Sequence, residues 1–183
     1  MWPMGSDGIL LRGWKILVFL ILLSVIALSQ LLPLSREAGA LPGPDLMFLV
    51  IAAYATRRPR MIPTWVYLVV LVLADVLLTR PLGLHAALSL VAVDMMRRRA
   101  VQAPAMPFAR EWLIVATAVT AVTLLEVVIL TLFLVPQAGL GLALIQLIVT
   151  VVTYPVVVLL IAEPFGLRRP KASDTDLILG RTT

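Results

Sequence analysis

The sequence predicts an all-α integral membrane protein with about six transmembrane helices in one bundle. Of its 183 residues, 61% are hydrophobic, whereas soluble domains are about 45–50% apolar. The mean hydropathy is +1.05. The apolar residues form runs too long for buried strands, and they do not alternate with polar residues as strands of an outer-membrane barrel do. Helices that cross a bilayer are therefore expected.

Six apolar segments are expected to be helical, and they are residues 14–34, 45–56, 63–79, 83–96, 112–135 and 140–163. The first follows basic residues as a secretory signal does, but its apolar run is longer than that of a signal, and five more segments follow it. We therefore expect an uncleaved helix. The chain divides into a polytopic membrane domain, residues 1–163, and a short cytoplasmic tail, residues 164–183.

The basic residues predict the orientation. With a cytoplasmic N-terminus, all of the 15 basic residues except Arg36 and Arg80 fall in cytoplasmic segments. This is the distribution that the positive-inside rule describes, so both termini are predicted to be cytoplasmic. The net charge of +5 then reflects topology and contact with membrane lipids, and nucleic acid is not an expected partner.

The second segment is short, because only ten apolar residues run from Leu46 to Ala55. They would rise about 15 Å, half the thickness of the hydrocarbon core. Two interpretations are open: a re-entrant hairpin, or a short crossing helix that neighbouring helices bury. A re-entrant segment would place Arg57–Arg60 outside and spoil the charge pattern, which favours the crossing.

Polar residues within these segments are the candidate functional residues. Asp75 and His85 flank the connection between the third and fourth segments. In an antiparallel hairpin they lie at similar depth, which predicts a hydrogen bond between carboxylate and imidazole. Such a pair either relays protons or locks the hairpin, and locking is favoured because relays are rare among intramembrane polar pairs.

Glu126 lies near the middle of the fifth segment. We expect it to be neutral and to donate or accept a hydrogen bond with Gln146, Thr150 or Thr153 of the sixth segment. Alternatively, a charged Glu126 pairs with a cation from elsewhere, for example from a partner protein.

Three further residues have simpler expectations. Asp45 precedes the second helix, where it either interacts with the helix dipole or contacts a partner. Asp94 is three residues before Arg97, so it is expected either to pair with Arg97 or to reach the inner interface. Pro155 leaves the Val151 carbonyl without its usual intrahelical donor, which predicts a kink in the last helix.

Several kinds of chemistry are excluded by composition. There is no cysteine and only one histidine, so thiolate catalysis, iron–sulfur ligation and a histidine-rich metal site are not expected. The sequence contains no phosphate-binding glycine loop and no serine beside a base in a catalytic arrangement. We expect neither an enzyme nor a cofactor.

Five short motifs occur in order between residues 44 and 155. They are Pro44-Asp45-Leu46, Arg57-Arg58-Pro59, Asp75, Pro81-Leu82-Gly83-Leu84-His85-Ala86 and Tyr154-Pro155. Each motif alone is common, but the ordered set resembles the MreD family of bacterial rod-shape-determining membrane proteins. The chain departs from the family pattern around Asp75, where it lacks the glycines that usually precede and follow this residue. A tighter or differently capped hairpin is therefore expected.

This resemblance implies a non-enzymatic scaffold of the cell-wall elongation machinery in the bacterial inner membrane. The implied partners are MreC, the glycosyltransferase RodA with its transpeptidase partner and, indirectly, MreB. The family also resembles the substrate-binding subunits of energy-coupling-factor transporters, which implies a six-helix bundle. Structural or partner-contact candidates are Asp45, Asp75, Gly83, His85, Glu126 and Pro155.

The alternative function is a subunit of a small-solute transporter of the vitamin type. It would bind its solute at an intramembrane site formed by Asp75, His85 and Glu126.

Overall fold

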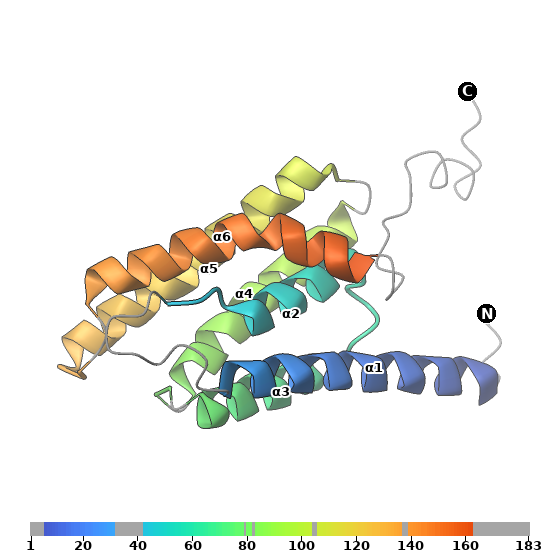
Figure 1. Ribbon diagram of the computed structural model, residues 1–183. Helices are drawn as coiled ribbons and strands as arrows, with labels where there is room; N and C mark the ends of the chain where they lie inside the picture. Colours follow the sequence, from blue (N-terminus) through green and yellow to red (C-terminus); the bar gives the residue numbers. More distant parts are fainter. Residues whose placement is uncertain are drawn as a thin grey trace.

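The computed structural model describes residues 6–31, 42–78, 80–81, 83–103, 106–136 and 139–162, with side chains of the first helix from Gly13 on. These residues form six α-helices and no strand (Figure 1). The helices are α1 (Ser6–Leu31), α2 (Leu46–Arg57), α3 (Thr64–Leu77), α4 (Leu84–Gln102), α5 (Phe108–Leu132) and α6 (Leu140–Ala162). The all-α prediction is confirmed for this part of the chain. The predicted tail, residues 164–183, and Arg36 lie outside the described residues.

Three of the described helices are long and apolar enough to cross a membrane. The spans are Gly13–Leu31, Phe108–Leu132 and Leu140–Ile161. Two others are apolar but shorter, with 12 residues in α2 and 14 in α3. The remaining helix, α4, has 19 residues, but its C-terminal half carries an aspartate and three arginines. These properties are those of an all-α membrane protein.

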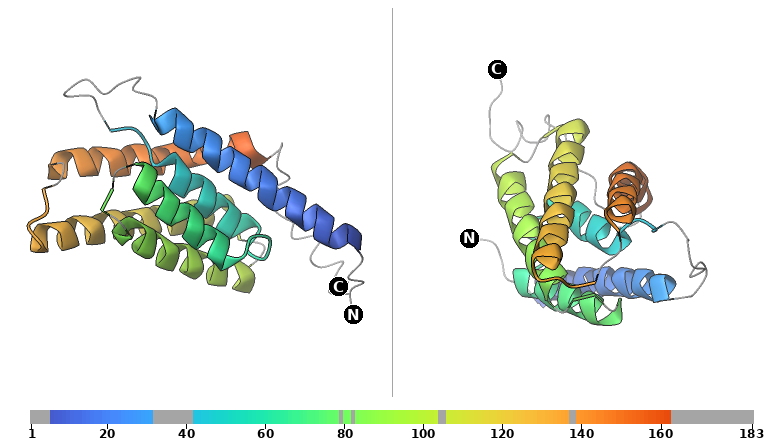
Figure 2. Two further views of the ribbon diagram at one scale, coloured as in Figure 1. Left: turned by 90° about the horizontal axis from the view of Figure 1, so that it is seen from below. Right: turned by 90° about the vertical axis from the view of Figure 1, so that its left-hand side faces the viewer.

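Successive helices run in opposite directions, and the pair α2 and α4 lies at the centre (Figure 1). These two helices pack against each other; α1 and α3 pack on one side of the pair and α5 and α6 on the other. The end-on view in Figure 2 shows α2 between α1 and α6. Helices α2, α4, α5 and α6 therefore form a closed ring, each in contact with the next.

The short helix α2 is the core of the bundle. Every residue from Met47 to Thr56 is buried, and the helix rises only about 18 Å. On the α1 side, Phe19 contacts the rings of Tyr54 and Tyr67 edge-on, with ring centroids 4.7 and 5.9 Å apart. Neighbouring helices thus enclose α2.

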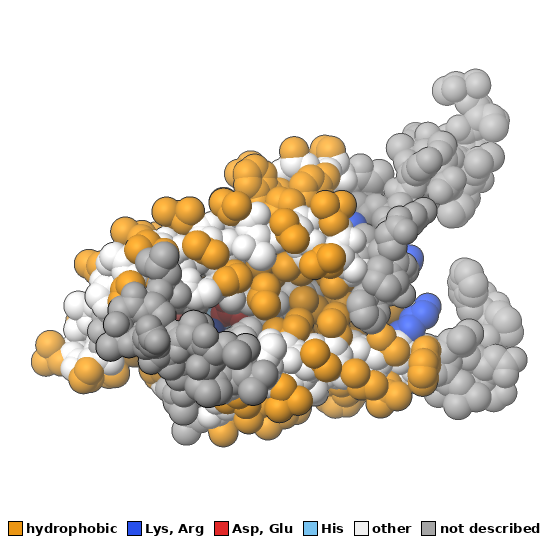
Figure 3. All heavy atoms as spheres, in the orientation of Figure 1, with side chains coloured by type: hydrophobic (Ala, Val, Ile, Leu, Met, Phe, Trp, Pro, Cys, Tyr) orange, Lys and Arg blue, Asp and Glu red, His pale blue; other side chains and the backbone are white. Residues whose placement is uncertain are grey.

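The exterior of the bundle is largely apolar (Figure 3). Large hydrophobic side chains are exposed along α1, α3, α5 and α6, and among them are Ile21, Leu73, Leu113, Val128, Ile148 and Leu159. Soluble monomers rarely expose apolar patches of more than a few hundred Å². A surface of this kind is suited to lipid or to the helices of other membrane proteins.

Arginines gather at one end of the bundle, on the right in Figure 3. This arginine-rich end carries Arg57, Arg58, Arg60, Arg97, Arg98, Arg99 and Arg110, which lie at or near the ends of α2, α4 and α5. Arg97 donates to the Pro59 carbonyl (3.0 Å) and lies over the Tyr67 ring, which ties α4 to the α2–α3 connection. Of the two alternatives for Asp94, the pair with Arg97 is wrong, since Asp94 pairs with Arg98, 2.7 Å away.

Pro155 lies inside α6, which continues through it. Because proline has no N–H, the Val151 carbonyl lacks its usual donor four residues on. The indole Nε1–H of Trp112 in α5 donates to this carbonyl at 3.0 Å. Pro155 therefore leaves the Val151 carbonyl free to accept a hydrogen bond that links α6 to α5.

Trp112→Phe should destabilise the protein by about 1 kcal/mol, since hydrogen bonds between membrane helices are worth this order of energy. In a Pro155→Ala background the new backbone N–H satisfies the Val151 carbonyl, so the same tryptophan substitution should cost less. A double-mutant cycle of unfolding free energies in detergent measures the difference. Equal costs in both backgrounds would contradict the proposed coupling.

Candidate functional site

Two polar clusters lie at opposite ends of α2. The His85 cluster comprises Asp45, Arg80, His85 and Glu126, at the end where α2 and α4 begin. The Glu111 cluster comprises Thr56, Arg57, Glu111 and Tyr154, at the arginine-rich end. Each cluster joins α2 to helices that are far from it in sequence.

Asp45 caps the N-terminus of α2. Its Oδ1 accepts the Phe48 N–H at 3.0 Å, which satisfies one of the free donors of the first helical turn. Its own N–H donates to Thr150 Oγ1 of α6 at 3.1 Å. The predicted role of Asp45 at the helix terminus is confirmed. Its side chain is only 11% exposed.

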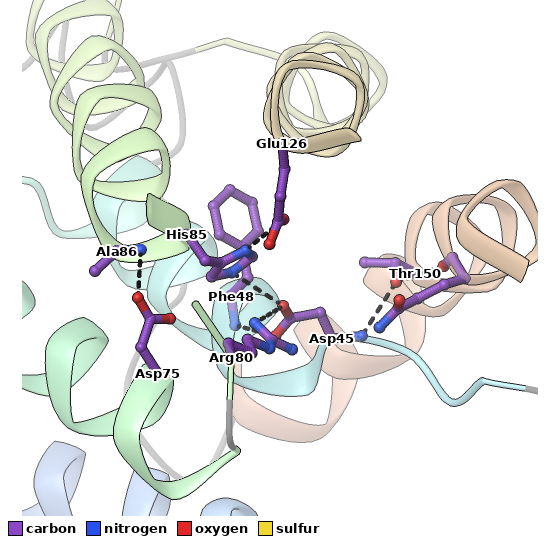
Figure 4. Close-up of polar contacts among 9 residues, drawn as sticks. Asp45, Phe48, Asp75, Arg80, His85, Ala86, Glu126 and Thr150 are labelled. Atoms are coloured by element: carbon purple, nitrogen blue, oxygen red, sulfur yellow. Dashed lines mark hydrogen bonds and ion pairs between the residues drawn. The ribbon is translucent and has the colours of Figure 1, made fainter. Parts of the chain in front are cut away.

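His85 links three helices (Figure 4). Its Nε2 lies 3.3 Å from Asp45 Oδ2, and its Nδ1 lies 3.0 Å from Glu126 Oε2 of α5. Arg80 Nη1 also donates to Asp45 Oδ2, at 3.0 Å. A doubly protonated imidazolium donates to both carboxylates, whereas a neutral ring donates to only one. The cluster thus places two carboxyl groups beside one arginine and one histidine.

Two predictions for these residues are wrong. Asp75 does not bond His85, because its Oδ2 accepts backbone N–H groups at the start of α4, whereas the His85 imidazole lies against Asp45 and Glu126. Glu126 bonds His85 of α4 rather than a residue of α6. The cation that a charged Glu126 requires is thus available within the chain.

Asp75 instead caps α4 from the neighbouring helix (Figure 4). Its Oδ2 accepts the N–H groups of Gly83 (3.1 Å) and Ala86 (3.0 Å), the N-cap and third positions of α4. These are the two donors that a capping box satisfies, and the N-cap glycine has no side chain to do so. Its charge also faces the positive end of the α4 dipole. Asp75 therefore locks the α3–α4 hairpin through the backbone.

Gly83 has a φ of +82°, in the left-handed region that favours glycine. An added Cβ would meet no heavy atom within 4 Å. Backbone conformation alone, and not lack of space, therefore explains glycine at this position.

A cavity of about 280 Å³ adjoins the His85 cluster within the ring of α2, α4, α5 and α6. Arg80, His85 and Glu126 line it together with Gln146 and Thr150. Figure 3 shows acidic side chains in the hollow between the orange surfaces. Valine and leucine side chains of α5 and α6 form much of the remaining wall. The arrangement can bind a small polar or amphipathic group.

The described residues contain no group of three or more His, Asp or Glu side chains placed to hold a metal ion.

The Glu111 cluster was not predicted. Glu111 is fully buried and accepts hydrogen bonds from Arg57 Nε (2.9 Å), Thr56 Oγ1 (3.1 Å) and the Tyr154 hydroxyl (2.7 Å). It thereby joins the C-terminus of α2 to α5 and α6. A sequence signal exists, since Glu111 lies in the first turn of α5, where acidic residues complement the helix dipole.

Comparison of the chain with family models, with curated proteins and with solved structures finds no match. What the protein does must therefore be inferred from its own residues.

Glu111→Gln should destabilise the protein by about 3 kcal/mol or more, because it leaves the Arg57 guanidinium, 9% exposed, without its charged partner. Thermal or denaturant unfolding in detergent, followed by circular dichroism, measures the loss.

Asp94→Asn is the matched control, since it breaks an exposed pair and should change stability by no more than about 0.5 kcal/mol. Equal effects of the two substitutions would show that the Glu111 cluster is not a stabilising contact.

Proposed function

We propose that the protein is a non-enzymatic, MreD-like scaffold of the cell-wall elongation machinery in the bacterial inner membrane. It crosses the membrane six times with both termini in the cytoplasm. There it acts with MreC and the peptidoglycan synthase, RodA and its transpeptidase partner, to maintain rod shape, and with MreB indirectly.

The antiparallel order of the helices and the arginine-rich end support six crossings. The arginines of α2, α4 and α5 lie at one end of the bundle (Figure 3), although their segments are far apart in sequence. Such an end fits a cytoplasmic interface with anionic lipids. The enclosure of α2 by its neighbours supports the crossing of a helix that is too short by itself.

The observation that carries the proposal is that the MreD-like motifs contact one another. Asp45, from the first motif, pairs with His85 of the fourth. Asp75 binds the backbone of Gly83 and Ala86 in that same motif. The motifs are thus pairs of interhelical contacts, and this gives a physical reason for their occurring together in one chain.

The second and fifth motifs meet through one residue, because Glu111 bonds both Arg57 and Tyr154. Hydrogen bonds and ion pairs at both ends of α2 hold the helices in a rigid bundle, and the exterior of this bundle is apolar. A rigid bundle of this kind suits a docking platform for the membrane helices of other proteins.

The first experiment is a pull-down of the tagged protein from its native membrane in gentle detergent, with mass spectrometry of the partners. Recovery of MreC, with or without the synthase, is the expected result. Recovery of a transporter ATPase pair, or of a small ligand without shape proteins, would contradict the scaffold.

Asp75→Ala should reduce recovery of MreC, because it removes both acceptor bonds to α4 and loosens the hairpin. Asp94→Ala, at an exposed pair on α4, should leave recovery unchanged. Asp75→Asn retains an acceptor oxygen and should give an intermediate recovery. Normal recovery and normal cell shape with a folded Asp75→Ala protein would refute the role of the hairpin.

A second candidate function is the solute-transporter subunit, and the cavity beside the His85 cluster is the observation in its favour. Asp75 does not line this cavity, so the site would consist of Arg80, His85 and Glu126. This function predicts pH-dependent uptake that Glu126→Gln abolishes. The scaffold predicts no such uptake.

A further inference from the structure

A second cavity lies at the arginine-rich end, between the C-terminal turns of α4 and the first turns of α5. Its volume is about 600 Å³, and its lining includes Arg99, Gln102, Arg110, Leu113, Ile114 and Thr117. It shares no residue with the cavity beside His85. Neither polar cluster of the bundle uses it.

The two arginines of this cavity are exposed cations. Neither the Arg99 nor the Arg110 side chain forms an ion pair or a hydrogen bond with the residues that the structure describes. The nearest acidic residues in sequence are already engaged, since Asp94 pairs with Arg98 and buried Glu111 binds Arg57. Within the described part of the chain, the cavity therefore has an uncompensated positive charge at its mouth.

The remainder of the lining is arranged along one face of α5. Arg110, Leu113, Ile114 and Thr117 follow one another at intervals of three, one and three residues, so they lie on a single stripe. The stripe runs about 10 Å from the end of the helix toward its middle. Its charge is at the end of the bundle, and its apolar groups lie deeper.

We propose that this groove binds one anionic phospholipid. The phosphate lies between the Arg99 and Arg110 guanidinium groups, and an acyl chain follows Leu113, Ile114 and Thr117. Basic pockets between membrane helices at the cytoplasmic side bind anionic headgroups in this way. A zwitterionic lipid fits less well, because its ammonium group meets two cations. The proposal requires a membrane at the arginine-rich end, but it does not require the wall partners.

Native mass spectrometry of the protein in non-ionic detergent, titrated with phosphatidylglycerol or phosphatidylcholine, tests the site. Phosphatidylglycerol should be retained preferentially. Arg99→Gln with Arg110→Gln should weaken its apparent affinity about 10- to 30-fold, since each arginine near an anionic headgroup contributes a factor of about five. Thr117→Phe, which fills the apolar part of the groove, should weaken binding of the lipid and leave both arginines in place.

The matched control is Lys15→Gln with Arg98→Gln, which removes the same charge outside the groove and should retain phosphatidylglycerol. Equal loss in the control, or none in Arg99→Gln with Arg110→Gln, would overturn the proposal. Glycerol phosphate, a headgroup without acyl chains, should not compete at comparable concentration. Competition as strong as that of the lipid would mean that the site binds free phosphate esters and would overturn the lipid assignment.

Discussion

The shortness of α2 is the constraint on which the rest of the structure depends. Its 12 residues are enclosed by neighbouring helices, so the side chains of Asp45 and Arg57 at its two ends are almost fully covered by other helices. Hydrocarbon offers them no hydrogen bonds. The chain therefore supplies partners at each end: Arg80 and His85 for Asp45, and Glu111 for Arg57. Both polar clusters are therefore explained by the shortness of α2.

In the α3–α4 hairpin, the free backbone N–H groups at the start of α4 also need a hydrogen-bond acceptor from another helix. Gly83, whose backbone is in the left-handed region, precedes α4 as its N-cap residue. It has no side chain that could accept a hydrogen bond from the first turn of this helix. Asp75 provides the missing acceptor from α3. A carboxylate buried against backbone N–H groups can thus be structural, although a buried charge in a membrane segment first suggests function.

Hydropathy predicts the number and order of the helices but not their ends. It places the end of the fourth helix at residue 96, whereas α4 continues to Gln102, because charged turns remain helical outside an apolar core. The depth of a residue along its helix does not predict the direction in which its side chain points around the helix axis. Pairing depends on that direction, so the partners predicted for Asp75 and Glu126 are wrong. For the same reason Glu111, whose partners come from α2 and α6, was overlooked.

The enclosure of α2 has a consequence for biogenesis. Two of the helices that cover it, α4 and α6, are synthesised after it, and Thr150, which bonds Asp45, follows that residue by 105 positions. When α2 leaves the ribosome, helices α4 and α6 have not yet been synthesised. The residues outside α2 that bond Asp45 and Arg57 at its two ends are also still missing. In the proposed topology, α2 therefore reaches its final surroundings only after the last helix has been synthesised, and its insertion is not independent of the crossings that follow it.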